Sequence, residues 1–338
     1  MESSMVDGIY TLANDVVYDQ LVALLNSIEA NVGSSLPVCV IAYDERVDKV
    51  RTEIAARKNV TLLEDPTLFA PWEDFSKQVW TAHPTALQIW QEQGISGVHR
   101  LGMNRRYAAF DPAAPFERFI YLDADVLVMN SLQNIFQALD AHDFVVYDFQ
   151  YKSPRHIYNL QSPKLQEVFP DSRIRSEVFC AGMYASKRGL LDQKQRDWLV
   201  AQLQTGEAEV LCMPAPNQSV LNYMVMRSEI PVHNLALQLP INQATGNAIT
   251  SNHFESRDHV LYDKEVQLTY LHYIGLSSKL FEQVCAGENV EFPYRDIFLH
   301  YRYLHELEKR PQFTGKSQAY NQPPTFVERT LKKLGLNR

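Results

Sequence analysis

The stretch RFIYLDADVLVMNSL, residues 118–132, places two carboxylates, Asp123 and Asp125, in a run that is otherwise almost entirely apolar. Residues 119–122 have the composition of a buried strand, so the aspartates stand where that strand leaves a sheet. In open α/β sheets, ligands bind beyond the carboxyl ends of the strands. Two carboxylates this close together are costly to bury unless a cation compensates them. The stretch therefore predicts a divalent ion shared with a diphosphate; the alternative is that the aspartates cap a turn or pair with Arg118 or a lysine.

The rest of the chain alternates strand-like and helix-like segments. Residues 8–12 and 36–45 predict two strands, and the apolar spacing of residues 18–31 predicts a helix between them. Further strands are predicted at residues 143–149, 177–185 and 265–274, and further helices at residues 46–58, 84–93, 131–139 and 218–228. This alternation favours an α/β sheet covered by helices on both faces.

Composition describes an ordinary globular protein. The 338 residues are 46% hydrophobic and 21% charged, with a net charge of -8, so nucleic acid is not an expected partner. The sequence has no apolar run long enough for a membrane span and no signal-like start, so we expect a cytoplasmic protein. Its cysteines are far apart and predict buried free thiols: Cys39, Cys180, Cys212 and Cys285.

The flanks of the two aspartates carry a family resemblance. The segment YLDADVLVMNSLQNIF, residues 121–136, resembles the metal-binding segment of family 8 glycosyltransferases, which include glycogenin and bacterial lipopolysaccharide galactosyltransferases. The resemblance extends over roughly residues 7–282 and implies a GT-A-type, Rossmann-like mixed sheet flanked by helices. It divides the chain into a nucleotide-sugar-binding catalytic domain, residues 1–287, and a C-terminal helical or irregular extension, residues 288–338.

The segment TLANDVVY, residues 11–18, resembles the first strand and loop of that family, which hold the uracil and ribose of a UDP donor. The resemblance implies that the donor is contacted by Leu12, Ala13, Asn14, Asp15 and Tyr18, and also by Ala124 of the D-x-D motif. Judged from their residue types alone, Asn14 and Asp15 are equally typical of helix caps.

Arg106 precedes the D-x-D motif by the same distance as an arginine of that family, and Arg105 is its neighbour. A guanidinium suits a phosphate well. The resemblance implies that Arg106 offsets charge on the β-phosphate. The alternative is that both arginines lie on a solvated helix face.

Two later segments resemble family motifs with substitutions. VFCAGMYA, residues 178–185, resembles a strand that usually reads F-N-x-G, with Cys180 in place of the asparagine. APNQSVLNYMV, residues 215–225, resembles a D-Q-x-x-L-N segment, with Asn217 in place of the aspartate. The resemblance implies catalytic roles for Asn217 and Gln218 and suggests altered sugar recognition.

The last motif is LHYIGLSSK, residues 271–279, which resembles the family pattern H-x-x-G-x-x-K. By this match His272 is the third metal ligand, while Gly275 and Lys279 contact the diphosphate; Lys279 stands one residue late and is also implied in catalysis. Two carboxylates, an imidazole and phosphate oxygens suit Mn²⁺ well and Mg²⁺ acceptably.

The function implied by the resemblance is metal-dependent, retaining transfer of a hexose from a UDP-sugar to an acceptor hydroxyl of a sugar, a lipid-linked glycan or a protein. One alternative is a catalytically weakened nucleotide-sugar-binding protein, in which Cys180 and Asn217 mark lost activity. Another is a sugar-1-phosphate nucleotidyltransferase, although no glycine lies between Gly8 and Gly33 to form a triphosphate loop. The basic end, residues 325–338, predicts at most weak peripheral membrane contact, or a tail without that role.

Overall fold

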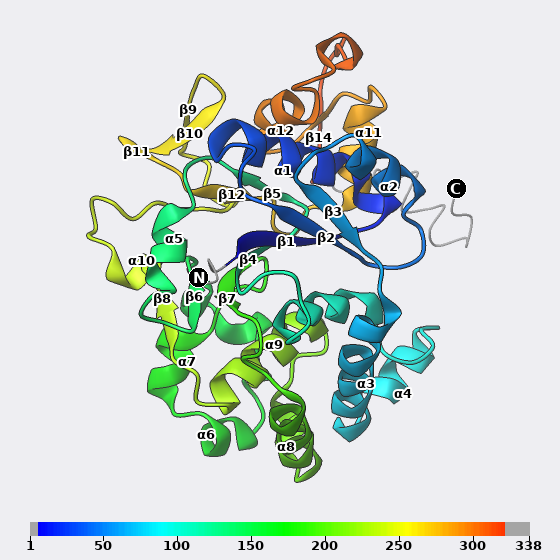
Figure 1. Ribbon diagram of the computed structural model, residues 1–338, viewed down its shortest axis with the longest axis vertical. Coiled ribbons are helices and arrows are strands. Elements are labelled where there is room, and N and C mark those ends of the chain that lie inside the picture. Colours follow the sequence, from blue (N-terminus) through cyan, green and yellow to red (C-terminus); the bar gives the residue numbers. More distant parts are fainter. Residues whose placement is uncertain (1–5, 322–338) are drawn as a thin grey trace, which may run out of the picture.

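The computed structural model describes residues 6–321, and a mixed seven-stranded sheet lies at their centre (Figure 1). Its strands lie in the order β3 (Val60–Leu63), β2 (Val38–Ala42), β1 (Asp7–Ala13), β4 (Arg118–Leu122), β7 (Met183–Lys187), β6 (Phe144–Val146) and β8 (Val232–Asn234). The first four are parallel, whereas β7 is antiparallel to both of its neighbours. The predicted α/β fold with a mixed sheet is thus confirmed.

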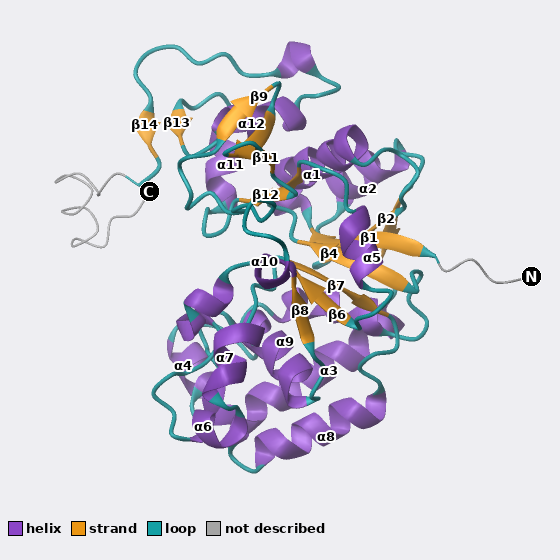
Figure 2. Ribbon diagram, turned by 90° about the vertical axis from the view of Figure 1, so that its left-hand side faces the viewer, coloured by secondary structure: helices purple, strands orange, loops and turns teal. Residues whose placement is uncertain are grey.

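Helices cover both faces of this sheet, as Figures 1 and 2 show from two directions. One layer contains α1 (Tyr18–Asn31), α2 (Asp48–Ala55), α11 (Ser278–Cys285) and α12 (Arg295–Arg302). The other contains α3 (Pro66–Ala82), α4 (Ala86–Glu92), α6 (Lys164–Val168), α7 (Asp171–Glu177), α8 (Gln193–Gln204) and α9 (Pro216–Arg227). The remaining helices are α5 (Gln133–Ala138), α10 (Leu235–Gln238) and the 3₁₀ helices η1 (Asp15–Val17), η2 (Leu101–Phe110), η3 (Gln150–Lys152), η4 (Pro154–His156), η5 (Glu207–Val210) and η6 (Leu307–Lys309).

Smaller sheets lie beside the main one. The pair that matters for the site is β5 (Val126–Val128) with β12 (Tyr270–His272), which are antiparallel. The others are β9 (Glu255–Arg257) with β10 (Val260–Asp263) and β11 (Val266–Gln267), and β13 (Val290–Glu291) with β14 (Gln318–Ala319). Because β5 begins directly after the D-x-D motif, β12 is brought to the end of β4.

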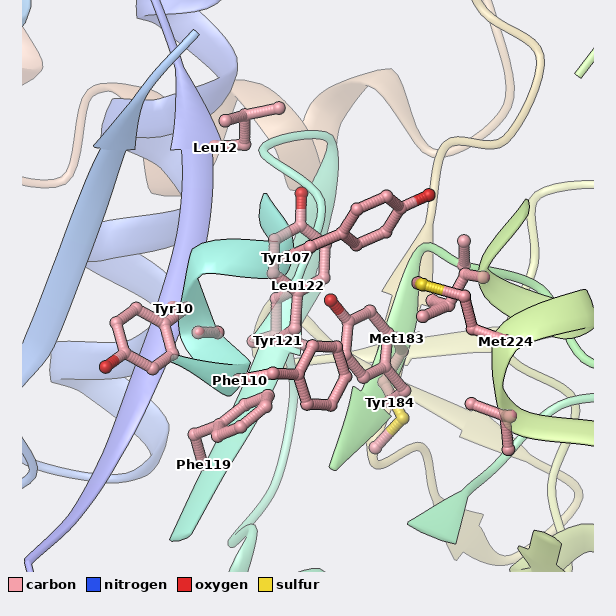
Figure 3. Packing of buried hydrophobic residues seen from close by; sticks show 14 of the residues in the cluster. Tyr10, Leu12, Tyr107, Phe110, Phe119, Tyr121, Leu122, Met183, Tyr184 and Met224 are labelled. Carbon is pink, nitrogen blue, oxygen red and sulfur yellow. The ribbon is translucent and has the colours of Figure 1, made fainter. Parts of the chain in front are cut away.

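Aromatic rings fill the core around β4 and β7 (Figure 3). Tyr121 of β4 stacks on Tyr184 of β7 with ring centroids 4.9 Å apart, and Phe119 meets Tyr10 of β1 edge to face at 5.3 Å. All four side chains are fully buried. Replacing such a buried ring with alanine typically lowers the free energy of unfolding by about 3–5 kcal/mol. The end of β4 is therefore held by tightly packed rings.

Two predicted strands differ from the structure. Residues 265–274 predicted one strand but form two, β11 and β12, because β11 pairs with β10 and β12 pairs with β5 in separate sheets. Residues 177–185 predicted a strand, but α7 continues to Glu177 and β7 begins only at Met183. The reason is a side chain: Asn222 of α9 accepts from the Phe179 amide at 2.9 Å and donates to the Phe179 carbonyl at 2.8 Å. Phe179 is therefore bound to a helix instead of a neighbouring strand, and Cys180 lies in a loop.

The first part of the C-terminal extension packs on the sheet's helical layer. The side-chain amide of Asn26 in α1 donates to the Tyr301 carbonyl of α12 at 2.7 Å. Phe298 of α12 belongs to a buried apolar cluster that also contains Ala23 of α1 and Leu127 of β5. The domain boundary after residue 287 stays a prediction, and the basic end at residues 325–338 lies outside the described residues.

Two further expectations concern cysteines and membranes. Cys39, Cys180 and Cys212 are buried free thiols as predicted, and Cys285 is free and partly buried. Within residues 6–321, none of the helices combines the length and apolar composition needed to cross a bilayer.

Candidate metal centre

The predicted metal ligands come together because of strand register. In the β5–β12 pair, His272 lies opposite Val126, the residue directly after Asp125. The amide of Tyr273 donates to the Asp125 carbonyl at 3.0 Å and continues this pairing. As a result, His272 Nε2 lies 3.4 Å from Asp125 Oδ1, and one ligand atom from each of Asp123, Asp125 and His272 lies within 4.8 Å of the others.

Neighbouring backbone holds His272 in place from its other edge. The His272 amide donates to the Asn247 carbonyl at 2.8 Å, and the Ile249 amide donates to the His272 carbonyl at 3.1 Å. On the other side stands Gly182, where an added Cβ would lie 2.3 Å from His272 Cε1. Because of this clash, a glycine is required at position 182. The Gly182 carbonyl also accepts from the Asp123 amide at 2.8 Å, so this residue contacts both predicted ligands.

Arg106 lies behind Asp123 and is completely buried. Its Nη2 is 3.1 Å from Asp123 Oδ1, and its other nitrogens donate to the carbonyls of Ala181 at 3.1 Å and Met103 at 3.0 Å. Burial by itself lowers the pKa of Arg106, but the charge of Asp123 more than offsets this and the pKa is raised. The structure thus places this permanent cation against a predicted metal ligand, without the exposed surface that a direct phosphate contact would need.

Tyr121 is a second partner of Asp123, and the sequence motifs did not indicate it. Its hydroxyl donates to Asp123 Oδ1 at 2.9 Å, and the Arg106 guanidinium lies over its ring at 4.7 Å. The signal was present in the sequence, because residues i and i+2 of an extended segment point to the same side. Asp123 is therefore oriented by two neighbours before any ion binds.

Asp125 has a different environment, because its charged neighbour is His272. Burial lowers the pKa of His272, but the adjacent carboxylate outweighs burial and raises the pKa well above its usual value. In the ion-free protein, the Asp125 carboxylate therefore favours the protonated form of His272.

The donor set fits a hard divalent ion. The side chains of Asp123 and Asp125 are each 25% exposed, so their oxygens are accessible, and His272 is 10% exposed. Two carboxylates and one imidazole form an oxygen and nitrogen set of the kind that binds Mn²⁺ or Mg²⁺.

The substituted position Cys180 lies next to the same histidine. Its Sγ is 4.0 Å from His272 Nδ1, and its amide donates at 3.0 Å to Asp148, which also accepts from the Gln150 amide at 2.6 Å. Burial raises the pKa of Asp148 to about 7. Asp148 was not selected from the sequence, although it follows the apolar residues 144–147 much as Asp123 follows β4.

The residues expected at the donor site from β1 have mixed outcomes. Leu12 and Ala13 end the strand and are buried. Asn14 caps η1 by accepting from the Val16 amide at 3.1 Å, so its alternative interpretation as a cap residue is confirmed. Asp15 lies inside η1 and accepts from the Val50 amide of α2 at 3.1 Å, and the N-cap position of α2 is Val47.

Tyr18 points toward other elements. Its hydroxyl donates to Glu53 at 2.9 Å, and the Arg302 guanidinium lies over its ring at 5.5 Å. The structure therefore does not bring Tyr18 together with the aspartates.

The start of α9 borders the candidate metal centre. Gln218 Oε1 accepts from the Ala181 amide at 3.1 Å, in the loop that also contains Cys180. The Asn217 carbonyl accepts from the Tyr107 hydroxyl at 2.6 Å, so its side chain is not used in that bond. Both residues are partly exposed.

The loop after β12 contains the two predicted diphosphate contacts. Gly275 has a φ of +83°, which a glycine adopts without strain. Ser277 caps α11 by accepting from the amide of Lys279 at 3.2 Å, and the Lys279 side chain is exposed. Their contact with a diphosphate stays a prediction.

Comparisons with solved structures identify the fold. The chain superposes on the bifunctional glycosyltransferase WbbM with a TM-score of 0.50 and 14% identity, covering 92% of this chain and 52% of that one. It superposes on an active-site mutant of LgtC with a TM-score of 0.50 and 14% identity, covering 82% and 94%. The galactosyltransferase LgtC in complex with donor and acceptor sugar analogues gives a TM-score of 0.49 at 15% identity over the same shares.

The described chain thus spans about half the length of WbbM. No family model and no curated protein matches the sequence. At these identities the comparisons establish architecture: the chain has the fold of GT-A glycosyltransferases.

Proposed function

We propose that the protein is a metal-dependent, retaining glycosyltransferase that moves a hexose from a UDP-sugar to an acceptor hydroxyl. The observation that carries this proposal is the convergence of Asp123, Asp125 and His272 within 4.8 Å at the end of β4, in a GT-A fold. Ligands of such sheets bind at this edge.

In this proposal the chain's residues divide the work. Asp123, Asp125 and His272 would hold a Mn²⁺ or Mg²⁺ ion, and Arg106 would keep Asp123 in position. When bound, the ion would supply Lewis-acid stabilisation of the departing diphosphate. Lys279 would add a positive charge there, and preorganised charge of this kind is usually the largest catalytic contribution.

The donor and acceptor would lie on either side of the metal centre. Leu12, Ala13 and Ala124 would line the nucleotide side together with Gly275. Gln218 would line the reacting face, since its Oε1 is fixed by the Ala181 amide and its Nε2 donates to no other residue within 6–321. Asn217 would hydrogen-bond a sugar hydroxyl.

Retention would follow a same-face course. An amide such as Gln218 is a poor covalent nucleophile, so the acceptor hydroxyl would attack from the side of the leaving UDP and pass its proton to a donor phosphate oxygen. The sugar would carry oxocarbenium character, as in glycoside hydrolysis.

The decisive experiment is calorimetric titration of UDP into the full chain with Mn²⁺ and with EDTA, followed by hydrolysis assays with UDP-glucose, UDP-galactose and UDP-GlcNAc. We expect UDP binding only with the ion and slow hydrolysis of one donor. Equal UDP affinity in EDTA would reject the metal-bridged donor site.

The second candidate is a nucleotide-sugar-binding protein of weakened activity. It is favoured by Cys180 and Asn217, which replace an asparagine and an aspartate of the resembling motifs and lie next to His272 and Gln218. Tight, metal-dependent UDP-sugar binding without hydrolysis or transfer to any acceptor would support this alternative.

A further inference from the structure

A cavity of about 550 Å³ adjoins the candidate metal centre on the side of His272 and Cys180. It lies between the segment after β6 and the segment before β9. Its walls are mostly uncharged polar groups and aromatic rings: Phe149, Gln150, Ser153, Asn247, Thr250, Ser251 and Tyr270. The other lining residues are Asp148, Lys152, His156, Cys180, Gly246, Ala248, His272 and Ile274.

The inner wall of this cavity is built before any ligand arrives. The side-chain amide of Asn247 donates to the Tyr147 carbonyl and to the Tyr270 hydroxyl, the latter at 2.9 Å. The Tyr270 hydroxyl itself donates to the Tyr147 carbonyl at 2.6 Å. These groups are buried, so the wall is rigid. The two hydrogen bonds of the Asn247 side-chain amide also hold its Oδ1 in one orientation. Uncharged polar groups on a rigid wall next to an aromatic side chain suit the hydroxyls and faces of a saccharide.

The outer wall of this cavity carries an exposed cation. Of the ionisable side chains that the segment after β6 contributes to the lining, Lys152 and His156 are nitrogen bases and Asp148 is the one carboxylate. Lys152 lies over the rings of Phe149 at 4.6 Å and Tyr151 at 5.9 Å. Arg155 donates to the His156 ring at 3.2 Å. Neither Lys152 nor Arg155 forms an ion pair with any residue of the described chain.

A second cavity provides an internal comparison. It measures about 630 Å³ and lies between α1, α2 and α12. There Arg57 pairs with Glu53 at 2.7 Å and Arg302 pairs with Glu306 at 3.2 Å. Those arginines are neutralised by their own surroundings, whereas Lys152 of the cavity beside the metal centre has no ion-pair partner within residues 6–321.

We propose that this cavity is the acceptor subsite and that the acceptor is an anionic saccharide, whose phosphate or carboxylate group pairs with Lys152 on the wall that His156 also lines. The inference rests on the proposed function and specifies the class of its acceptor. An anion is favoured because Lys152 lines the cavity, is exposed and has no ion-pair partner within residues 6–321, so it can form a charge-assisted hydrogen bond with a ligand.

The test uses the full chain with saturating Mn²⁺ and UDP and measures the affinity of three probes: glucose, glucose 6-phosphate and glucuronic acid. We expect at least one anionic probe to bind about tenfold tighter than glucose, the gain expected from one charge-assisted hydrogen bond. Lys152→Gln should remove most of that preference while leaving glucose binding unchanged. Lys58→Gln is the matched control, because Lys58 lines the other cavity and is exposed.

The outcomes separate this inference from the proposed function. If UDP and Mn²⁺ bind normally but all three probes bind equally, or Lys152→Gln keeps the preference, the anionic acceptor is rejected alone. If Lys152→Gln instead weakens UDP itself, the cation serves the diphosphate, and if it weakens only UDP-glucuronic acid relative to UDP-glucose, the anion belongs to the donor sugar; either result overturns the assignment to the acceptor. If UDP does not bind at all, the proposed function and this inference fall together.

Discussion

Asp123 and Asp125 are separated by one residue, and the two sides of the candidate metal centre that they form are built differently. Asp123 faces Arg106 and Tyr121, whose charge and hydroxyl are permanent at any physiological pH. Asp125 faces His272, which is itself a predicted ligand and gains or loses a proton. One side therefore orients a carboxylate in advance, while the other would exchange a proton for an ion in the proposed function.

The largest expected effect follows from removing the carboxylate on the exchanging side. Asp125→Asn should weaken Mn²⁺-dependent UDP binding by more than about 100-fold, because even the outer partners of metal ligands are worth 10–100-fold. Calorimetry measures this loss. Asp143→Asn is a suitable control, since Asp143 only pairs with Lys187 at the surface, and an equal loss in both variants would contradict the special role of Asp125.

The next effect comes from the orienting side. Arg106→Met should weaken metal-dependent UDP binding by about 10–100-fold and lower the free energy of unfolding by about 2–3 kcal/mol. The stability loss is set below the value for a fully buried pair because the Asp123 side chain is 25% exposed. Urea unfolding and calorimetry measure the two quantities.

Arg105→Met provides the matched comparison for that variant. Arg105 is the residue before Arg106 on the same 3₁₀ helix, but it is partly exposed and pairs with Glu73 at 2.6 Å. Its ion pairs are with Glu73 and Glu45 and not with Asp123, so its replacement should leave metal-dependent UDP affinity unchanged. Equal losses for the two arginines would show that Arg106 has no particular role in holding Asp123.

The pairing of Asp125 with His272 predicts that the stability of the ion-free protein and the affinity for Mn²⁺ depend on pH in opposite directions. Because the pKa of His272 is raised, its pairing with Asp125 stabilises the ion-free protein below the ordinary histidine range, and this contribution is lost as pH rises through the raised value. Coordination needs neutral imidazole, so Mn²⁺ affinity should rise by up to about tenfold per pH unit over the same range. Thermal unfolding in EDTA and Mn²⁺ titrations between pH 6.5 and 9 test this, with His272→Gln as the pH-insensitive control. A flat Mn²⁺ affinity in the wild-type protein would contradict it.

The two sides of the metal centre also differ in how much of their structure the sequence predicts. An apolar strand followed by two aspartates predicts where a ligand binds, because strand composition and the sheet-edge rule are local and general. The strand register that brings His272 to Asp125 joins residues far apart in the chain, and only the family resemblance pointed to it. Arg106 was selected by its distance along the chain, but its complete burial behind Asp123 is a property of the folded core.

Tyr18 illustrates the same limit from the other direction. Its position in the first segment implied a contact with the donor, but its partners are Glu53 of α2 and Arg302 of α12. Arg302 belongs to the C-terminal extension, which lies outside the resembling region. A side chain whose neighbour comes from an extension that a motif does not cover cannot be oriented from the motif.

The smallest expected effect isolates a single hydrogen bond on the orienting side. Tyr121→Phe removes the hydroxyl that donates to Asp123 Oδ1 at 2.9 Å but keeps the ring beneath Arg106. Since Arg106 still holds the same oxygen, metal-dependent UDP affinity should fall by only about 3–10-fold, corresponding to about 0.5–1.5 kcal/mol.

Tyr184→Phe is the matched control for that hydrogen bond, because the two tyrosines stack on each other and both are buried. The Tyr184 hydroxyl has no hydrogen-bond partner among the described residues. Its removal should therefore leave UDP affinity unchanged and should raise or preserve the melting temperature, because a buried hydroxyl without a partner costs free energy. If Tyr121→Phe and Tyr184→Phe behaved alike in calorimetry, Asp123 would be held by Arg106 alone, and the orienting side of the metal centre would reduce to one ion pair.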